Sequence, residues 1–133
     1  MFLLDTNILS DLIRQPDGVV ASAIAEAGEQ AIATSIVVAA ELRFGAEKRA
    51  SPRLTEKVEE LLSLIPVLPL KGDADIHYGR LHAELERRGT LIGANDMLIA
   101  AQALAMGATL VTDNMREFER VDGLELVNWL RSS

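Results

Sequence analysis

The sequence predicts a single α/β domain over residues 1–133, with three α/β/α layers and a mainly parallel central sheet of four or five strands. Short apolar runs alternate along the chain with longer segments of helical periodicity. Such alternation is typical of parallel sheets, because their strands are joined through crossover helices. The chain shows no internal repeat, linker or low-complexity segment, and 133 residues suffice for one domain with its own core.

The opening stretch, Phe2-Leu3-Leu4-Asp5, is the point from which the prediction starts. Three apolar residues run into a carboxylate, and residues 8–13 then follow at helical spacing. A buried strand that leads into a helix has this form. Asp5 would lie at the carboxyl end of the strand, which is where ligands bind in open α/β sheets.

Proline, glycine and serine mark the boundaries of the later elements. A turn is predicted at 15–18, Ser35 and Asp73 are candidate N-caps, Ser51-Pro52 breaks a helix, and Gly28, Gly89 and Gly107 follow helix ends. The predicted helices span 19–27, 36–49, 54–65, 74–88 and 94–106, with a helical turn near 117–118. The predicted strands span 31–34, 67–70, 108–112 and 124–127, and Pro69 places the second of these at an edge.

Composition narrows the class of protein. The chain has no cysteine, which excludes disulfides and thiolate metal sites and is typical of the cytoplasm. No apolar run approaches the ~18 residues of a membrane span, and the first residues lack the basic segment of a signal peptide, so no membrane association is expected. The net charge of −7 argues against binding nucleic acid by bulk electrostatics, although a divalent cation would offset part of it.

Several chemistries lack their motifs in this sequence. Neither a dinucleotide-binding G-x-G-x-x-G nor a P-loop is present, and without cysteine there is no thiol nucleophile. His77 and His82 are five residues apart on one predicted helix, so they point to different faces and make poor co-ligands. A phosphoacceptor domain of the receiver type needs a lysine after a late strand, but Lys71 is the last lysine here.

Four carboxylates stand out by their positions. Asp5 and Asp113 each follow a predicted strand, Glu41 lies on the apolar stripe of its helix, and Asp96 opens a helix that is apolar nearly all round. Each has an ordinary alternative role: an N-cap for Asp5, a stripe edge for Glu41, a helix-dipole partner for Asp96 and an Asx-turn for Asp113.

If the four carboxylates meet, they cannot all stay ionised together without a cation. Oxygen ligands without cysteine or histidine favour Mg²⁺ or Mn²⁺. Such a site activates water and stabilises the charge of a phosphate under attack. If the four side chains converge, the sequence therefore predicts a divalent-metal site of a kind that can act on phosphate.

A basic cluster follows the Glu41 helix. Its members are Lys48, Arg49, Arg53 and Lys57. The cluster could contact a phosphate backbone, or it could be the solvated end of a helix. The five aromatic residues of the chain are scattered, so a stacking platform for single-stranded nucleic acid is not expected.

Four segments in this order resemble PIN-domain ribonucleases, and more narrowly the VapC toxins of toxin–antitoxin pairs. The segments are FLLDTNILSDL, TSIVVAAELRFGAEK, IGANDMLIAAQALAMGATLVTDN and EFERVDGLELVNWL. By position, the resemblance implies that Asp5, Glu41, Asp96 and Asp113 are the four catalytic and metal-binding acids. The fourth position is often Asn or variable in relatives. Beside these acids, the resemblance implies supporting roles for Thr6, Asn7, Thr112 and Asn114.

The resemblance also implies an activity and partners. It implies Mg²⁺-dependent cleavage of RNA, with Mn²⁺ as an alternative ion, by a homodimer that a cognate VapB-like antitoxin inhibits. DNA would be contacted only through the antitoxin complex. The alternative function is that of a DNA-binding or regulatory relative with weak or vestigial nuclease activity.

Overall fold

The computed structural model describes residues 1–131 and confirms the predicted α/β class, with a five-stranded sheet in which every neighbouring pair of strands is parallel. The strand order is β3-β2-β1-β4-β5. The strands are β1 (Phe2–Leu4), β2 (Ile32–Ser35), β3 (Val67–Leu68), β4 (Thr109–Val111) and β5 (Leu126–Val127).

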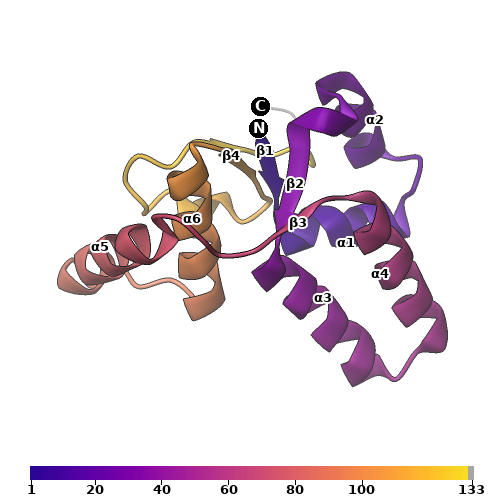
Figure 1. The fold of residues 1–133 in the computed structure, drawn as a ribbon, viewed down its shortest axis with the longest axis horizontal. Helices are drawn as coiled ribbons and strands as arrows, with labels where there is room; N and C mark the ends of the chain where they lie inside the picture. The colour runs from indigo at the N-terminus through magenta and orange to yellow at the C-terminus, as the bar shows by residue number, and fades with distance from the viewer. Residues whose placement is uncertain (132–133) are drawn as a thin grey trace.

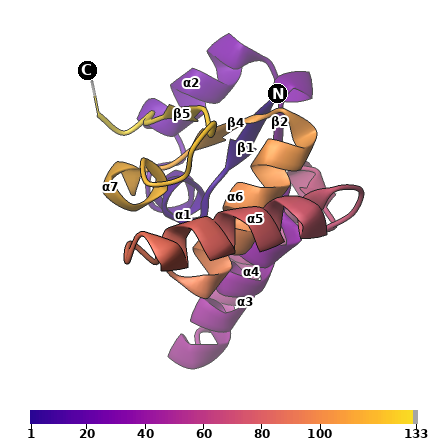
Figure 2. The same ribbon diagram turned by 90° about the vertical axis from the view of Figure 1, so that its left-hand side faces the viewer.

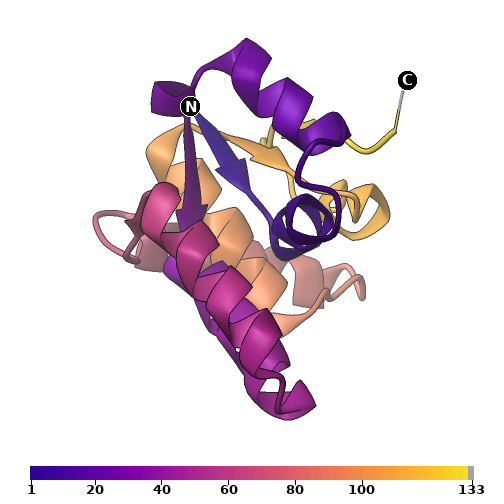
Figure 3. The same cartoon turned by 90° about the vertical axis from the view of Figure 1, so that its right-hand side faces the viewer.

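Helices flank the sheet, as Figures 1, 2 and 3 show from three sides. The helices are α1 (Thr6–Arg14), α2 (Val19–Ala27), α3 (Ile36–Arg49), α4 (Pro52–Leu64), α5 (Ala74–Arg87), α6 (Ala94–Met106) and α7 (Met115–Phe118), with a 3₁₀ turn at Glu29–Ala31. Figure 2 shows α5 and α6 from their side of the molecule, and Figure 3 shows α1, α2 and α4 from the other. Among residues 1–131 no helix is long and apolar enough to cross a membrane.

The outer strands are shorter than the sequence predicts. β3 ends at Leu68, because Pro69 has no N–H with which to continue the ladder. β5, predicted from residue 124, spans only Leu126–Val127. The inner strand β2 keeps its four residues but begins at Ile32 rather than at residue 31, because Ala31 closes the 3₁₀ turn. Helix α4 begins at Pro52 rather than at residue 54: Ser51 accepts a hydrogen bond from the Leu54 N–H, and proline suits the first helical position.

The order of the strands places the switch point of the sheet beside β1. The chain goes from β1 outward to β2 and β3, and then returns to the other side of β1 for β4 and β5. Leu4 is paired with Val111 of β4, and the N–H of Asp5 donates to the Val111 carbonyl at 2.9 Å. The residues that follow β1 and β4 are therefore neighbours at the edge where α/β sheets bind ligands.

Two helix pairs frame that edge of the sheet. Helix α3 leaves β2 and extends past the sheet with α4 packed along it, while α6 packs against α5 and β4 (Figure 1). The helix that is apolar nearly all round in the sequence, α6, has six buried residues, as such a pattern predicts. The largest side chains of the core are Phe118, Leu3, Leu4, Ile8, Leu9, Leu85, Ile99 and Leu110.

Candidate functional site

Asp5 ends β1 and begins α1 with its side chain buried. Its backbone is extended, its carboxylate accepts a hydrogen bond from the Thr6 N–H at 2.8 Å, and only 3% of its surface is exposed. The capping role that the sequence left open for this residue is therefore present. A cap alone does not need burial, however, and burial raises the pKa of the Asp5 carboxyl above its usual range.

The polar residues predicted beside the site hold Asp5 in place. The Thr112 hydroxyl donates to Oδ2 of Asp5 at 2.7 Å, and it accepts from the Asn114 N–H at 3.0 Å. Asn7 donates through Nδ2 to both Asp5 and Thr112 at 3.4 Å, while its Oδ1 accepts from the Asp113 N–H at 2.9 Å. These bonds tie the end of β1 to the end of β4 and fix the orientation of the carboxylate.

Glu41 reaches the same place from α3. Its Oε1 accepts a hydrogen bond from the Thr6 hydroxyl at 2.6 Å, and its Oε2 lies 3.5 Å from Nδ2 of Asn95. Its side chain is half-buried, and its negative charge contributes to the raised pKa of Asp5. One carboxylate thus joins α1, α3 and the first turn of α6.

Asp96 lies in the first turn of α6 and is the most strongly perturbed carboxyl at the site. Burial, in the first place, raises its pKa to about 7; a hydrogen bond with Glu117 and the charges of Asp5, Glu117 and Glu41 add to the rise. The charges of Asp5, Glu41 and Glu117 are thus near enough to Asp96 to act on its pKa. We call Asp5, Glu41, Asp96 and Glu117 the acid cluster.

Glu117 is the residue that the sequence reasoning missed. It lies on α7, the four-residue helix that follows β4, and its Oε2 accepts a hydrogen bond from Nδ2 of Asn114 at 3.1 Å. The sequence signals a helical turn there, but a single turn has no periodicity that marks one face as the inner one. Its spacing from Asn114, three residues, is the one available signal, since residues i and i+3 share a helix face.

Asp113 has a different environment from the other predicted acids. Its Oδ1 accepts hydrogen bonds from Nδ2 of Asn128 at 2.8 Å and from Nε of Arg131 at 3.0 Å. These two partners lower the pKa of the Asp113 carboxyl. Asp113 is linked to Asp5 through its backbone N–H, which donates to Asn7, and not through its carboxylate. The role of Asp113 as fourth metal ligand therefore stays a prediction, and Glu117 is a competing candidate for it.

The chemistry of the acid cluster fits a hard divalent cation. Its donors are all carboxylate oxygens, and the raised pKa of Asp96 reflects its burial first and then the charges of the neighbouring acids. Within residues 1–131, no three acidic or histidine side chains are grouped closely enough to hold an ion, so the side chains of the cluster would have to move closer together around one. Mg²⁺ fits such a site because it keeps several waters and takes one or two carboxylates directly.

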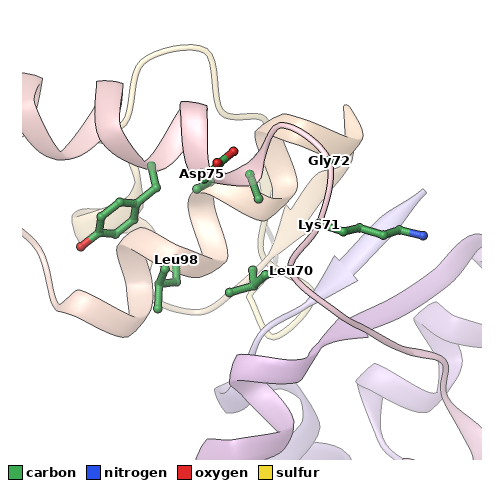
Figure 4. Close-up of a pocket in the computed structure, with 8 residues that line it drawn as sticks. Leu70, Lys71, Gly72, Asp75 and Leu98 are labelled. Carbon is green, nitrogen blue, oxygen red and sulfur yellow. The ribbon is translucent and has the colours of Figure 1, made fainter.

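Two cavities open on the acid cluster at Thr6 and Glu41. The first, of about 310 Å³, lies between α1, α3 and α4, and the second, of about 780 Å³, lies between α3 and the start of α6. A third cavity, of about 380 Å³ around Leu70, Lys71 and Tyr78, contains none of the four cluster acids (Figure 4). Substrate that reaches the acids can therefore extend to either side of α3.

The fold and the acid cluster together define a class of protein: small α/β domains that gather carboxylates at the switch point of a parallel sheet, as metal-dependent hydrolases do. The PIN domain matches residues 2–124. The chain is 38% identical to ribonuclease VapC2 of Rickettsia felis, covering 97% of this chain and 98% of that one. It is 40% identical to the tRNA(fMet)-specific endonuclease VapC of Shigella flexneri, over 96% and 97% of the two chains.

Solved structures agree with these relatives. A chain in the DNA-bound VapBC complex of Salmonella typhimurium superimposes with a TM-score of 0.90 at 36% identity, over 96% of this chain and 97% of that one. The protein therefore belongs to the PIN-domain family and, within it, to the VapC ribonucleases.

The raised pKa of Asp96 predicts a pH-dependent stability in the absence of metal. Because the folded state holds this proton more tightly than the unfolded state does, its stabilising contribution is present at pH 4 and is lost as the pH rises to about 7. With chelator present, we expect the parent to lose stability relative to Asp96→Asn between pH 5 and pH 8, as measured by urea unfolding.

Asp113→Asn is the matched control, because the pKa of Asp113 is lowered rather than raised. The contribution of Asp113 to stability changes with pH only in more acidic solution. The difference in the free energy of unfolding between the parent and Asp113→Asn should therefore stay constant from pH 5 to pH 8. Parallel stability curves for the parent and Asp96→Asn would contradict the described environment of Asp96.

Proposed function

We propose that the protein is a Mg²⁺-dependent endoribonuclease and the toxin component of a type II toxin–antitoxin pair that acts in the cytoplasm. The observation that carries the proposal is the acid cluster at the switch point of a PIN-domain sheet, in a chain whose relatives are named ribonucleases. Mn²⁺ is the alternative ion, since it accepts the same oxygen ligands. Intact acids at this edge favour an active nuclease over a regulatory relative with vestigial activity.

The acid cluster would hold the cation, with Asp5 and Asp96 as its central ligands. When bound there, Mg²⁺ supplies Lewis-acid stabilisation of phosphate charge and lowers the pKa of coordinated water. Asp5 is already fixed by Thr112 and Asn7, so little reorganisation is needed on its side. The raised pKa of Asp96 keeps a proton on it near neutral pH, and Asp96 would have to lose that proton to hold a cation as a carboxylate.

Glu41 is the best-placed acceptor for a proton of the attacking water. Its Oε1 is held by the Thr6 hydroxyl, while its Oε2 has only the long 3.5 Å contact with Asn95. It is half-buried and borders both cavities that open on the cluster. Glu41 Oε2 would therefore be available to accept the proton beside the scissile phosphate.

The acid cluster also suggests how an antitoxin inhibits the enzyme. A guanidinium group matches carboxylates in a bidentate fork, so a VapB-like partner would place an arginine beside Asp5 and Asp96 and cover helix surfaces with apolar contacts. Solved relatives include VapBC complexes, one of them from Rickettsia felis with a fragment of promoter DNA. For this chain, whose net charge is −7, DNA contact would come through the antitoxin.

We expect a homodimer that uses the exposed apolar side of α3. Phe44 is 66% exposed and Ile36 is 48% exposed, and both line the cavity of about 780 Å³. Phe44→Glu should convert a dimer of the 14.4 kDa chain into a monomer in light scattering, because it places a charge within an apolar contact. Leu64→Glu, which changes a leucine on α4 that is 76% exposed, should leave the dimer intact. A parent protein that is monomeric at micromolar concentration would contradict this expectation.

Paired substitutions test the assignment of the fourth acid. Glu117→Gln removes a charge that lies against Asp96, so cleavage of RNA in millimolar Mg²⁺ should fall by about 10²-fold or more. Asp113→Asn removes a charge paired with Arg131, so its effect should stay below about tenfold. The rates are measured on unfractionated tRNA and on a mixed-sequence single-stranded RNA.

A larger loss of cleavage in Asp113→Asn than in Glu117→Gln would instead support Asp113 as the fourth acid of the site, as the resemblance implies. Absence of RNA cleavage by the parent itself, with either Mg²⁺ or Mn²⁺, would contradict the proposed function.

A further inference from the structure

Two arginines join the segments of the chain that carry Asp96 and Glu117. Arg88 directly follows α5, and its Nη2 donates a hydrogen bond to the Arg120 carbonyl at 2.7 Å. Arg120 lies shortly after α7, and its Nη1 donates to the Leu91 carbonyl at 3.0 Å. Each arginine thus binds the backbone of the segment that contains the other. We call these two hydrogen bonds the arginine brace.

The arginine brace is close along the chain to two members of the acid cluster. Leu91 belongs to the loop that leads into α6, and Asp96 lies in the first turn of that helix. Arg120 comes just after α7, which carries Glu117. Figure 2 shows α7 and the end of α5 on the same side of the molecule. The brace therefore connects the two segments whose acids share a hydrogen bond.

Helix α7 needs outside contacts to hold Glu117 in one direction. It has four residues, and its N-cap residue, Asn114, makes no side-chain capping bond. A single turn of helix is not stable by itself, because nucleation costs more than one turn of hydrogen bonds returns. Phe118 is fully buried and anchors α7 in the core, but one anchor leaves the turn free to pivot about it. The arginine brace supplies a second attachment.

Arg88 is oriented by two acids beside it. Its guanidinium lies 3.5 Å from Glu84 and 3.7 Å from Asp122, and 39% of its side chain is exposed. Such long, partly exposed ion pairs add little stability. A guanidinium N–H that donates to a carbonyl makes a stronger, charge-assisted bond, and the planar group fixes its direction. The contacts of Arg88 therefore suit positioning better than stabilisation.

We propose that Arg88 and Arg120 are positioning residues for the metal site, because the arginine brace sets how close Asp96 and Glu117 lie to each other. This inference rests on the proposed function and deepens it by naming residues outside the acid cluster on which cation binding depends. Within residues 1–131, neither arginine bonds to a member of the acid cluster. Each therefore acts through the backbone that it holds.

Two other roles for the arginines make different predictions. If Arg88 and Arg120 only stabilise the fold, their removal lowers the melting temperature but leaves the Mg²⁺ affinity of the folded protein unchanged. If they act on the acids by charge alone, removal of any positive charge equally near the acid cluster has the same effect. A positioning role predicts weaker Mg²⁺ binding in the folded protein, confined to the two arginines of the brace.

Mg²⁺ binding is measured by titration calorimetry, well below the melting temperature of every variant. Arg88→Gln and Arg120→Gln should each weaken Mg²⁺ binding by about tenfold, as is usual when a group that orients metal ligands is lost. The Mg²⁺ concentration for half-maximal cleavage of RNA should rise by a similar factor. Thermal unfolding in chelator shows separately how far each variant is destabilised.

Two neighbouring arginines are matched controls. Arg87 is the last residue of α5 and has only a surface ion pair with Glu84, with 68% of its side chain exposed. Arg116 is exposed on α7, directly beside Glu117. Arg87→Gln and Arg116→Gln remove the same charge without removing a bond of the brace, so Mg²⁺ affinity should stay within about twofold of the parent's.

A double-mutant cycle with Glu117→Gln shows whether the brace acts through Glu117. Once that carboxylate is gone, adding Arg120→Gln should weaken Mg²⁺ binding by less than about twofold, because effects that pass through one residue are not additive. Parent affinity in both brace variants, a comparable loss in either control, or a full tenfold effect of Arg120→Gln in the Glu117→Gln background would overturn the positioning role.

The proposed function fails by a different result. A parent that binds Mg²⁺ in calorimetry but does not cleave RNA would refute the proposed function and leave the assignment of the arginine brace standing. A parent that binds no Mg²⁺ would overturn both.

Discussion

The structure of this domain depends on keeping one buried carboxylate, that of Asp5, in a fixed place at the end of the central strand. Two chain segments, the end of β4 and the start of α1, hold it in position. The N–H of Asp5 donates a hydrogen bond to β4, and its side chain caps α1. The side chains of Thr112 and Asn7 donate to its Oδ2. Burial opposes the charged form of Asp5, while these hydrogen bonds favour it. The result is a carboxylate with little freedom to move.

The other members of the acid cluster arrive around this fixed point on helices. Glu41 lies on α3, Asp96 on α6 and Glu117 on α7. These are three different helices near the carboxyl edge of the sheet. Without a cation their charges oppose one another, and the raised pKa of Asp96 relieves part of the repulsion by keeping a proton on that residue. The same repulsion that destabilises the metal-free fold makes a strong receptor for positive charge, whether from Mg²⁺ or from an inhibitory guanidinium.

The sequence was sufficient for the sheet edge and for three of the four cluster members. The position of Asp5 was predicted from the end of a strand. The positions of Glu41 and Asp96 were predicted from apolar helix faces, because such faces predict burial. It was not sufficient for Glu117, since one turn of helix shows no face. The orientation of the Asp113 side chain could not be predicted from the sequence either. Its partners Asn128 and Arg131 come from the last segment of the chain, and local patterns do not encode such tertiary contacts.

The central claim is that the acid cluster is a metal site, and thermal unfolding tests it most directly. Melting temperatures are compared for the parent, Asp5→Asn and Asp96→Asn, with chelator and with millimolar Mg²⁺. In chelator, the variants should melt at or above the parent's temperature, because each removes a repelling charge. Mg²⁺ should raise the melting temperature of the parent and do much less for the variants, because a ligand that binds only the folded state stabilises it. Equal Mg²⁺ shifts in the three proteins would contradict the claim.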